Sequence, residues 1–211
     1  MLRIIQRDIF PEESEVLYET DFSHGELLRD FDIGRGDWEY SDGWLTGEWP
    51  HDGGALIYSK AEYFGDVLLD FEARTVPPCD NDLNFTFSAK GWDAERNTAD
   101  VSYIGGLGGW WLGKVGLERY PGGKLNAMSS LHKLEAGRIY HIQTGRVDNR
   151  IFIFIDGELA LECADPEPLP YGKIGFGLYA SKVQFRNLKV MRPCVRPFIT
   201  SYAELHGKNN K

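Results

Sequence analysis

Short segments in which apolar and polar residues alternate recur along the chain, and this pattern constrains the fold more than any other feature. In "VLLDFEAR" (67–74), the odd-numbered positions are apolar, whereas Asp70, Glu72 and Arg74 follow Leu68 at the even-numbered ones. Successive side chains of a strand point to opposite faces, so this strand would have one apolar and one charged face. The pattern is typical of half-buried strands in an antiparallel sheet.

Turn signals separate these runs. Asp42-Gly43 is the dipeptide that a tight hairpin turn prefers, and Asp148-Asn149 and Asp156-Gly157 divide a later run into three strands. About a dozen strands at this spacing predict an all-β protein, a two-sheet antiparallel β-sandwich of jelly-roll type. We expect the strands in the segments 15–22, 37–49, 54–63, 66–76, 81–92, 99–120, 138–164 and 172–191.

The remaining segments define the domain organisation. Helical patterns are confined to residues 24–31 and 199–208. A length of 211 residues fits one domain, which we place at residues 1–192, followed by a polar C-terminal tail at 193–211.

Charge and composition restrict the classes of partner. The net charge of -9 excludes a nucleic-acid partner, because phosphate binding requires an excess of Lys and Arg. No long apolar segment predicts a membrane span or a signal peptide, so we expect a cytoplasmic protein with no membrane partner. Three irregularly spaced cysteines predict neither a disulfide framework nor a zinc site, and a homo-oligomer is compatible with the sequence.

The most specific motifs lie in residues 151–190, which run strand, Asp-Gly turn, strand, loop, "GKIGFG" and a final strand "VQFRNLKV". This order resembles the C-terminal half of the concanavalin A-like lectin/glucanase superfamily. Within it, the chain is most similar to the YesU-like family and to the 3-keto-disaccharide hydrolase-like domains. The N-terminal segments "WEYSDGWLTGEW" and "SKAEYFGDVLLDFEAR" fit the same order, so the resemblance covers roughly residues 15–191. It implies a β-sandwich in which one curved sheet presents a concave polar face.

The polar faces of several strands define a candidate site. If these strands are neighbours, their polar side chains line one trough, for which the alternative is an ordinary solvated sheet surface. The expected trough contains Asp70, Glu72, Arg74, Asn84, Thr86, Ser88, Ser102, Glu118 and Tyr120, and is joined by His141 and Gln143.

Aromatic residues beside this trough point to a saccharide ligand. Sugars pack their C–H faces on aromatic rings, and their hydroxyl groups need carboxylates, amides or arginines. Trp49, Trp92 and Trp110 adjoin loops and are candidate contacts, whereas Trp44 follows a hairpin turn and is expected in the core. Arg96 would add a charged rim suited to a sugar carboxylate.

Carboxylates in the trough suggest glycosidic bond cleavage. Retaining glucanases of the resembled superfamily carry Glu-x-Asp-x-x-Glu or Glu-x-Asp-x-Glu on one strand, and here the pattern reads Leu68-x-Asp70-x-Glu72, without the first Glu. We therefore expect a carbohydrate-active protein, a glycoside hydrolase or lyase acting on a small saccharide. Asp70, Glu72, Glu118 or His51 would be its acid/base groups, and Arg74 and Asn84 would position the sugar. The alternative is a non-catalytic, lectin-like carbohydrate-binding protein.

Two loops have further interpretations. "CDND" (79–82) offers oxygen ligands for Ca²⁺, although turn formation explains the same residues, and no other metal or cofactor is predicted. "GGLGGWWLGK" (105–114) would form either a flexible flap beside the ligand or a glycine-rich hairpin.

Overall fold

The computed structural model describes residues 1–122 and 125–198, without the side chain of Trp110. Within these residues the only α-helix is α1 (Leu27–Asp30), one turn long, and a 3₁₀ turn, η1, spans Gly109–Trp111. None of the described helices has the length and apolar character needed to cross a membrane. The all-β prediction is therefore confirmed.

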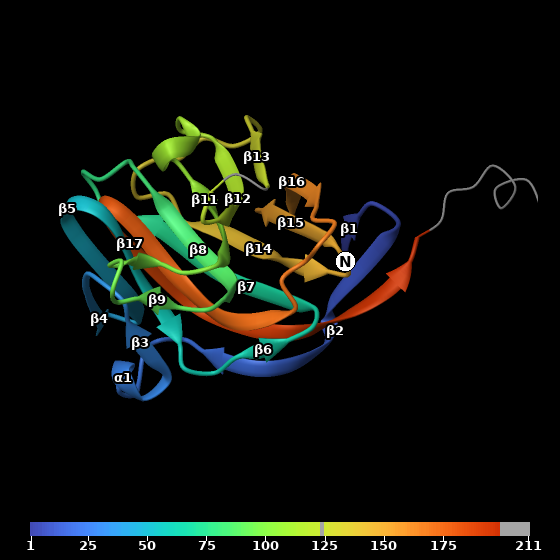
Figure 1. Ribbon diagram of the computed structural model, residues 1–211, viewed down its shortest axis with the longest axis horizontal. Coiled ribbons are helices and arrows are strands. Elements are labelled where there is room, and N and C mark those ends of the chain that lie inside the picture. The colour runs from blue at the N-terminus through green and yellow to red at the C-terminus, as the bar shows by residue number, and fades with distance from the viewer. Residues whose placement is uncertain (123–124, 199–211) are drawn as a thin grey trace, which may run out of the picture.

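The strands follow the chain in the order shown in Figure 1. They are β1 (Leu2–Ile4), β2 (Arg7–Thr20), β3 (Phe31–Ile33), β4 (Asp37–Ser41), β5 (Trp44–Ser59), β6 (Tyr63–Phe64), β7 (Val67–Thr75), β8 (Leu83–Ala89), β9 (Trp92–Asp93), β10 (Thr98–Ala99), β11 (Ser102–Leu107), β12 (Val115–Tyr120), β13 (Asn126–Ser129), β14 (Tyr140–Val147), β15 (Arg150–Ile155), β16 (Glu158–Ala164) and β17 (Tyr171–Pro197).

Two long strands, β5 and β17, form an antiparallel ribbon that takes part in both layers of the fold. Their register shifts between Tyr179 and Ser181, and Ala180 at this point has a φ of 47°. Such a bulge bends a strand and increases its twist. On the edge of β17 opposite β5, β8 pairs with the residues before the bulge and β7 with those after it. Each half of β17 therefore begins a different layer.

What we call the first sheet contains β13, β12, β11, β8, the first half of β17, the second half of β5, and β3. The second sheet contains β16, β15, β14, β7, the later half of β17, the first half of β5, β4 and β2. Although β7 and β8 do not pair, the rings of Phe71 and Phe85 lie 5.6 Å apart between centroids. The apolar faces of the two sheets thus face each other in a sandwich, which confirms that prediction.

Phenylalanines fill the centre between the sheets. Phe176 and Phe185, one from each half of β17, stack with their ring centroids 4.1 Å apart. Phe71 packs against Phe176 at 5.2 Å with its ring nearly perpendicular. All three are buried in one apolar cluster, and offset and edge-to-face ring pairs of this kind add stability beyond area burial.

An N-terminal hairpin, β1 and β2, covers part of the outer surface of the second sheet. Leu2, Ile4 and Ile9 pack with Leu68 and Phe152 in a separate apolar cluster. Figure 1 shows β2 running beside the red end of β17, with which it pairs. Because β17 reaches Pro197, the domain boundary expected at residue 192 falls inside a strand.

Local signals were correct in several turns. Asp42 and Gly43 have φ values of 52° and 75° in the hairpin between β4 and β5, and the segment 138–164 forms β14, β15 and β16. Two expectations differ. The segment "GKIGFG" and the final strand, which were expected to be two separate strands within residues 172–191, belong to one strand, and only four residues of the segment 24–31 are helical. The helix expected at 199–208 lies outside the described residues.

Replacing Phe176 with Ala should lower the free energy of unfolding by about 3–5 kcal/mol, because it removes a ring that contacts both sheets and leaves a cavity. Leu131→Ala, at a side chain that is 61% exposed, is the control and should change it by less than about 0.5 kcal/mol. Urea denaturation of both variants measures the difference. Equal effects would contradict this description of the core.

Candidate functional site

The expected trough is divided between two surfaces. Asp70, Glu72 and Arg74 lie on β7 in the second sheet, whereas the other predicted strands, β8, β11 and β12, belong to the first. Because the apolar sides of both sheets meet in one core, their polar sides point in opposite directions. The expectation of one shared polar face is therefore wrong, because Glu118 lies on the opposite side of the sandwich from Asp70 and Glu72. The acid/base roles of Asp70 and Glu72 stay a prediction. Period two places side chains on a face but does not assign a strand to a sheet.

On the outer surface of the second sheet, which we call the second-sheet face, Asp70 is held by two neighbours on β14. The Nε2 atom of His141 lies 2.7 Å from Asp70 Oδ1, and Gln143 Nε2 donates to Oδ2 at 2.6 Å. The hydrogen bond to Asp70 raises the pKa of His141 above its ordinary value, against the opposing effect of burial. His141 and Gln143 thus join Asp70 as predicted, but as its partners.

Glu72 and Arg74 are also paired on this face. Arg186 Nε donates to Glu72 Oε2 at 2.5 Å, and Arg74 Nε donates to Gln184 Oε1 at 2.8 Å. The two guanidinium groups lie 4.5 Å (Arg74) and 4.3 Å (Arg186) from the centroid of the Trp44 ring. Trp44 is buried as expected, although it is not a member of the central apolar cluster, and both cations contact its ring. These charged groups form a closed network that stabilises the sheet surface.

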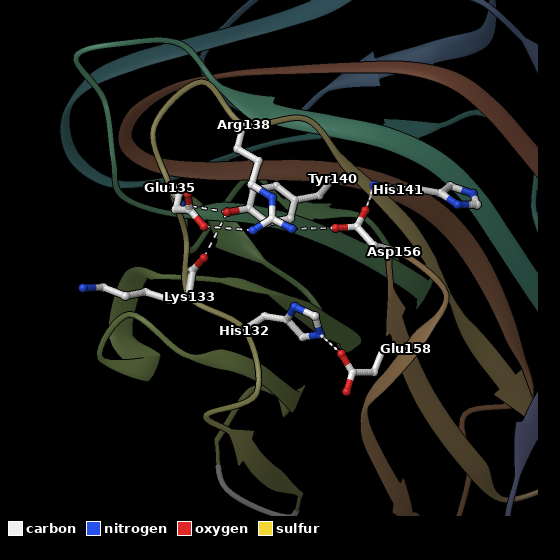
Figure 2. Close-up of polar contacts among 8 residues, drawn as sticks. All are labelled: His132, Lys133, Glu135, Arg138, Tyr140, His141, Asp156 and Glu158. Atoms are coloured by element: carbon white, nitrogen blue, oxygen red, sulfur yellow. Dashed lines mark hydrogen bonds and ion pairs between the residues drawn. The ribbon is translucent and has the colours of Figure 1, made fainter.

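Figure 2 shows how this network continues at the start of β14. Asp156 accepts hydrogen bonds from the His141 backbone N–H and from Arg138, both at 2.9 Å, and Arg138 also donates to Glu135 at 2.8 Å. The His141 ring points away from Asp156 in this view. The loop before β14 is therefore held to the β15–β16 turn by ion pairs.

The outer surface of the first sheet, which we call the first-sheet face, carries most of the other predicted side chains. Its polar members are Asn84, Thr86, Ser88, Ser102, Glu118 and Tyr120, together with Tyr58, Tyr179 and Asp82. Glycines stand between them at residues 106, 116, 175 and 177. At Gly106, a Cβ would lie 2.4 Å from Asn84 Oδ1, so the absence of a side chain lets neighbouring groups pack against the backbone.

Trp111 closes part of this face. Its ring lies over Gly116, where an added Cβ would be 2.0 Å from it, and the residue is only 1% exposed. With Tyr58, Ile104 and Ala99 it forms a small apolar cluster outside the main core. The glycine-rich segment is therefore packed on the sheet in this structure.

Several buried polar atoms on the first-sheet face have no hydrogen-bond partner among the residues that the structure describes. They include Tyr58 Oη, Asn84 Oδ1 and Glu118 Oε1. Buried polar atoms are normally satisfied by protein, water or ligand, and each orphan costs free energy. Burial also raises the pKa of Glu118. In contrast to the paired second-sheet face, this face has unused hydrogen-bonding capacity.

Asp82, just before the start of β8, has a carboxyl group with a raised pKa. It is 4% exposed, and burial raises its pKa to about 7, while a hydrogen bond with the Asn84 side chain acts in the opposite direction. The turn at Gly108 and Gly109 covers it: a Cβ on Gly109 would lie 2.2 Å from Asp82 Oδ1. Asn81 fixes that turn by accepting the Gly109 N–H at 3.0 Å.

Exposed groups surround this end of the face. The Tyr179 hydroxyl donates to Asp52 Oδ1, and both residues reach solvent. His51 is exposed and packs edge-to-face on Trp49, with ring centroids 4.8 Å apart. These residues lie where β5 and β17 bend together, so the bulge that connects the sheets also positions the rim.

Arg35 links the β9–β10 hairpin to this rim. Its guanidinium lies 4.9 Å from the Trp92 ring centroid, donates to the Asn97 carbonyl at 2.6 Å and also donates to the Gly54 carbonyl. Trp92 packs on the backbone of Gly34. The half-buried ring of Trp92 is thus held in a fixed orientation at the side of the first-sheet face.

The structure gives less support to the other residues that were predicted to contact a saccharide. Arg96 Nε donates to Asp93 Oδ2 at 2.5 Å, so its charge is already paired. The side chain of Trp110 lies outside the described residues. Among the described residues, no group of three or more His, Cys, Asp or Glu side chains is placed to hold a metal ion. In the loop 79–82, the Cys79 N–H donates to the Val76 carbonyl at 2.9 Å in a turn, and Asp82 is buried beneath Gly108 and Gly109.

Sequence reasoning missed Asp82, Tyr179, Arg35 and Tyr58 as members of this surface. Asp82 was left out of the expected trough, although it continues the alternation of β8. For Tyr179 a signal existed, because it follows Gly175 and Gly177 with period two in the same strand. Arg35 comes from a loop, where no periodicity predicts orientation.

Fold and surface together define a concanavalin A-like, carbohydrate-related β-sandwich. The family model of the 3-keto-alpha-glucoside-1,2-lyase-like domain matches residues 19–191, and the chain belongs to this family. This confirms the resemblance to 3-keto-disaccharide hydrolase-like domains, while the YesU-like resemblance stays a prediction. No curated protein matches the chain.

Solved structures with this fold include binding modules and enzymes. The carbohydrate-binding module CBM66 from Bacillus subtilis has a TM-score of 0.63 and 17% identity, over 77% of this chain and 96% of that one. A Bacillus subtilis protein of unknown function with a galectin-like fold gives 0.68 and 14%, over 85% and 96%. A prokaryotic β-1,3-1,4-glucanase from a mouse hindgut metagenome gives 0.59 and 14%, over 84% and 99%. These identities show a shared fold.

The Asp82 carboxyl should make stability depend on pH. Its folded pKa of about 7 lies above the ordinary value of 3.8, so between these pH values the folded state keeps a proton that the unfolded state releases. The free energy of unfolding therefore falls as pH rises through this window. Asp82→Asn should remove this decrease in the free energy of unfolding, which is about 1.4 kcal/mol for each unit by which the folded pKa exceeds the unfolded one. Urea denaturation at pH 4.5 and 7.5 measures it, and parallel profiles for both proteins would contradict it.

Asp70→Asn should lower the pKa of His141, because the raised value depends first on the hydrogen bond to that carboxylate. The interaction stabilises the folded protein at low pH and is lost as pH rises through the folded pKa of His141. NMR titration of the imidazole resonances measures the shift. Asp37→Asn, at an exposed carboxylate on β4, is the control, and a His141 pKa unchanged by Asp70→Asn would refute the pairing.

Proposed function

We propose that the domain binds a small saccharide on the first-sheet face, at the end bordered by Tyr179, Asp52 and Trp92. The observation that carries the proposal is the unused hydrogen-bonding capacity of this face, at Asn84 and its neighbours, beside an aromatic and charged rim. Sugar hydroxyls both donate and accept hydrogen bonds, and they suit a mixture of amide, phenol and carboxylate groups. The second-sheet face has similar residues, but they satisfy one another.

A second candidate function is elimination from a 3-keto-glycoside, and the pKa of about 7 at Asp82 favours it. A general base works best when its pKa lies near the pH at which the enzyme operates. In the family, the name 3-keto-alpha-glucoside-1,2-lyase-like also points to this reaction class. Hydrolysis remains the alternative within the same substrate class.

The elimination requires few catalytic groups. A ketone at C3 acidifies the proton on C2, a base removes this proton, and the electron pair forms the C1–C2 double bond as the bond from C1 to the glycosidic oxygen breaks. The departing oxygen takes up one proton, so the reaction needs no oxidant. Asp82 would accept the C2 proton, and movement of the Gly108–Gly109 turn would give the sugar access to it. Tyr179 and Asp52 would hold the sugar.

Methyl 3-keto-α-glucoside should bind the protein, and Tyr179→Phe should weaken binding by about tenfold, since a hydrogen bond involving a charged group contributes about 1.5 kcal/mol or more. If elimination occurs, Asp82→Asn should lower its rate by about 100-fold or more while binding persists. Isothermal titration calorimetry measures binding, and the ultraviolet absorbance of the conjugated enone distinguishes elimination from hydrolysis.

The matched control is Glu72→Gln, a carboxylate-to-amide change on the second-sheet face, which should alter neither quantity. Binding without turnover by the unmodified protein would assign a binding module and exclude the elimination. A loss of binding in Glu72→Gln but not in Tyr179→Phe would place the ligand on the second-sheet face and refute the proposal.

A further inference from the structure

A cavity of about 530 Å³ opens at the opposite end of the first sheet from the Tyr179–Asp52 rim. Tyr171, at the start of β17, lies eight residues before Tyr179, which corresponds to about 26 Å along an extended strand. The cavity is lined by Glu62, Ser88, Ala89, Lys90, Asp100, Val101, Leu169, Pro170, Tyr171 and Gly172. It is therefore separate from the site proposed above.

The distinctive feature of this cavity is the exposed ring of Tyr171 in its wall, which is supported by the neighbouring ring of Phe64. The rings of Phe64 and Tyr171 stack with centroids 4.9 Å apart and an angle of 18° between their planes. Phe64 is 66% exposed and Tyr171 is 47% exposed, which is unusual for two adjacent large rings. The strand pairing of Tyr171 with Phe64 fixes both backbones, so the Tyr171 ring is oriented before any ligand arrives.

Polar groups of both signs stand around this ring. Lys90 and Glu62 are exposed and enter no ion pair with each other, and the Lys90 backbone is fixed because its N–H donates to the Val101 carbonyl at 2.9 Å. Asp100 Oδ1 accepts the Val101 N–H at 2.7 Å and lies 3.6 Å from Arg96 Nη2, so both contacts use one oxygen of this carboxylate. One ammonium and two carboxylates are suited to hydroxyl groups rather than to a strongly charged ligand.

We propose that this cavity is a second carbohydrate site, which holds one neutral hexopyranoside unit stacked on Tyr171. The flat ring would take the C–H face of the sugar, and Lys90 and Glu62 would bind its hydroxyls. The volume exceeds that of one sugar ring, so a neighbouring unit of a longer glycan can extend from it. Because a stiff aromatic contact loses little entropy on binding, a preoriented Tyr171 makes a suitable anchor.

The test uses the full chain and two simple probes, methyl β-glucopyranoside and methyl α-glucopyranoside, observed by saturation-transfer difference NMR with titration. Binding of at least one glycoside should be weakened tenfold or more by Tyr171→Ala and preserved in Tyr171→Phe, which keeps the ring. Glu72→Gln, on the second-sheet face, should leave this binding unchanged, and the loss caused by Tyr171→Ala should be equally large when Tyr179→Phe is also present. The two sites can therefore fail or succeed independently.

Several results would overturn the second site. Equal affinities of the unmodified protein and Tyr171→Ala for both glycosides would do so, as would the absence of any Tyr171-dependent binding. p-Nitrophenol alone is the further probe, and binding of this flat ring as tightly as a glycoside would show that the cavity selects aromatic rings rather than sugars. Leu131→Ala, at another exposed apolar side chain, controls for nonspecific effects of truncation.

Discussion

The bend in the β5–β17 ribbon is the constraint on which the rest of the structure depends. One bulge at residues 179–181 lets a single pair of strands contribute to both layers, and β7 and β8 attach to the same edge of β17 on either side of it. This arrangement brings Phe176 and Phe185 face to face in the core. It also turns Tyr179 and Asp52 outward at the corner. Core packing and the candidate rim therefore have one structural origin.

The two outer faces use similar residue types for opposite purposes. On the second-sheet face, Asp70 and Glu72 each have a cationic or amide partner within hydrogen-bonding distance. On the first-sheet face, Asn84 and Glu118 keep buried oxygen atoms without partners. A polar group that is already satisfied gains little from a ligand, whereas an orphaned group gains a hydrogen bond. Pairing, rather than the presence of carboxylates, is what distinguishes the candidate site.

Much of the fold could be predicted from the sequence because its signals are local. The Asp42-Gly43 turn and the alternation in β7 and β8 depend only on neighbouring residues, and the order of motifs identified the superfamily. The site could be predicted only in part, because whether β7 and β8 share a sheet depends on pairing with β17, about a hundred residues away. The raised pKa of Asp82 likewise depends on burial beneath Gly108 and Gly109. The alternation of residues within a strand does not predict that these distant glycines approach Asp82.

The N-terminal hairpin has a consequence for how this domain is delimited. The family match begins at residue 19, yet Leu2, Ile4 and Ile9 shield Phe152 and Leu68 on the second sheet. A fragment limited to the residues of the family match would expose this apolar patch to water and to other copies of the fragment. The N-terminal hairpin, most of which precedes the family match, is therefore an integral part of the folded domain.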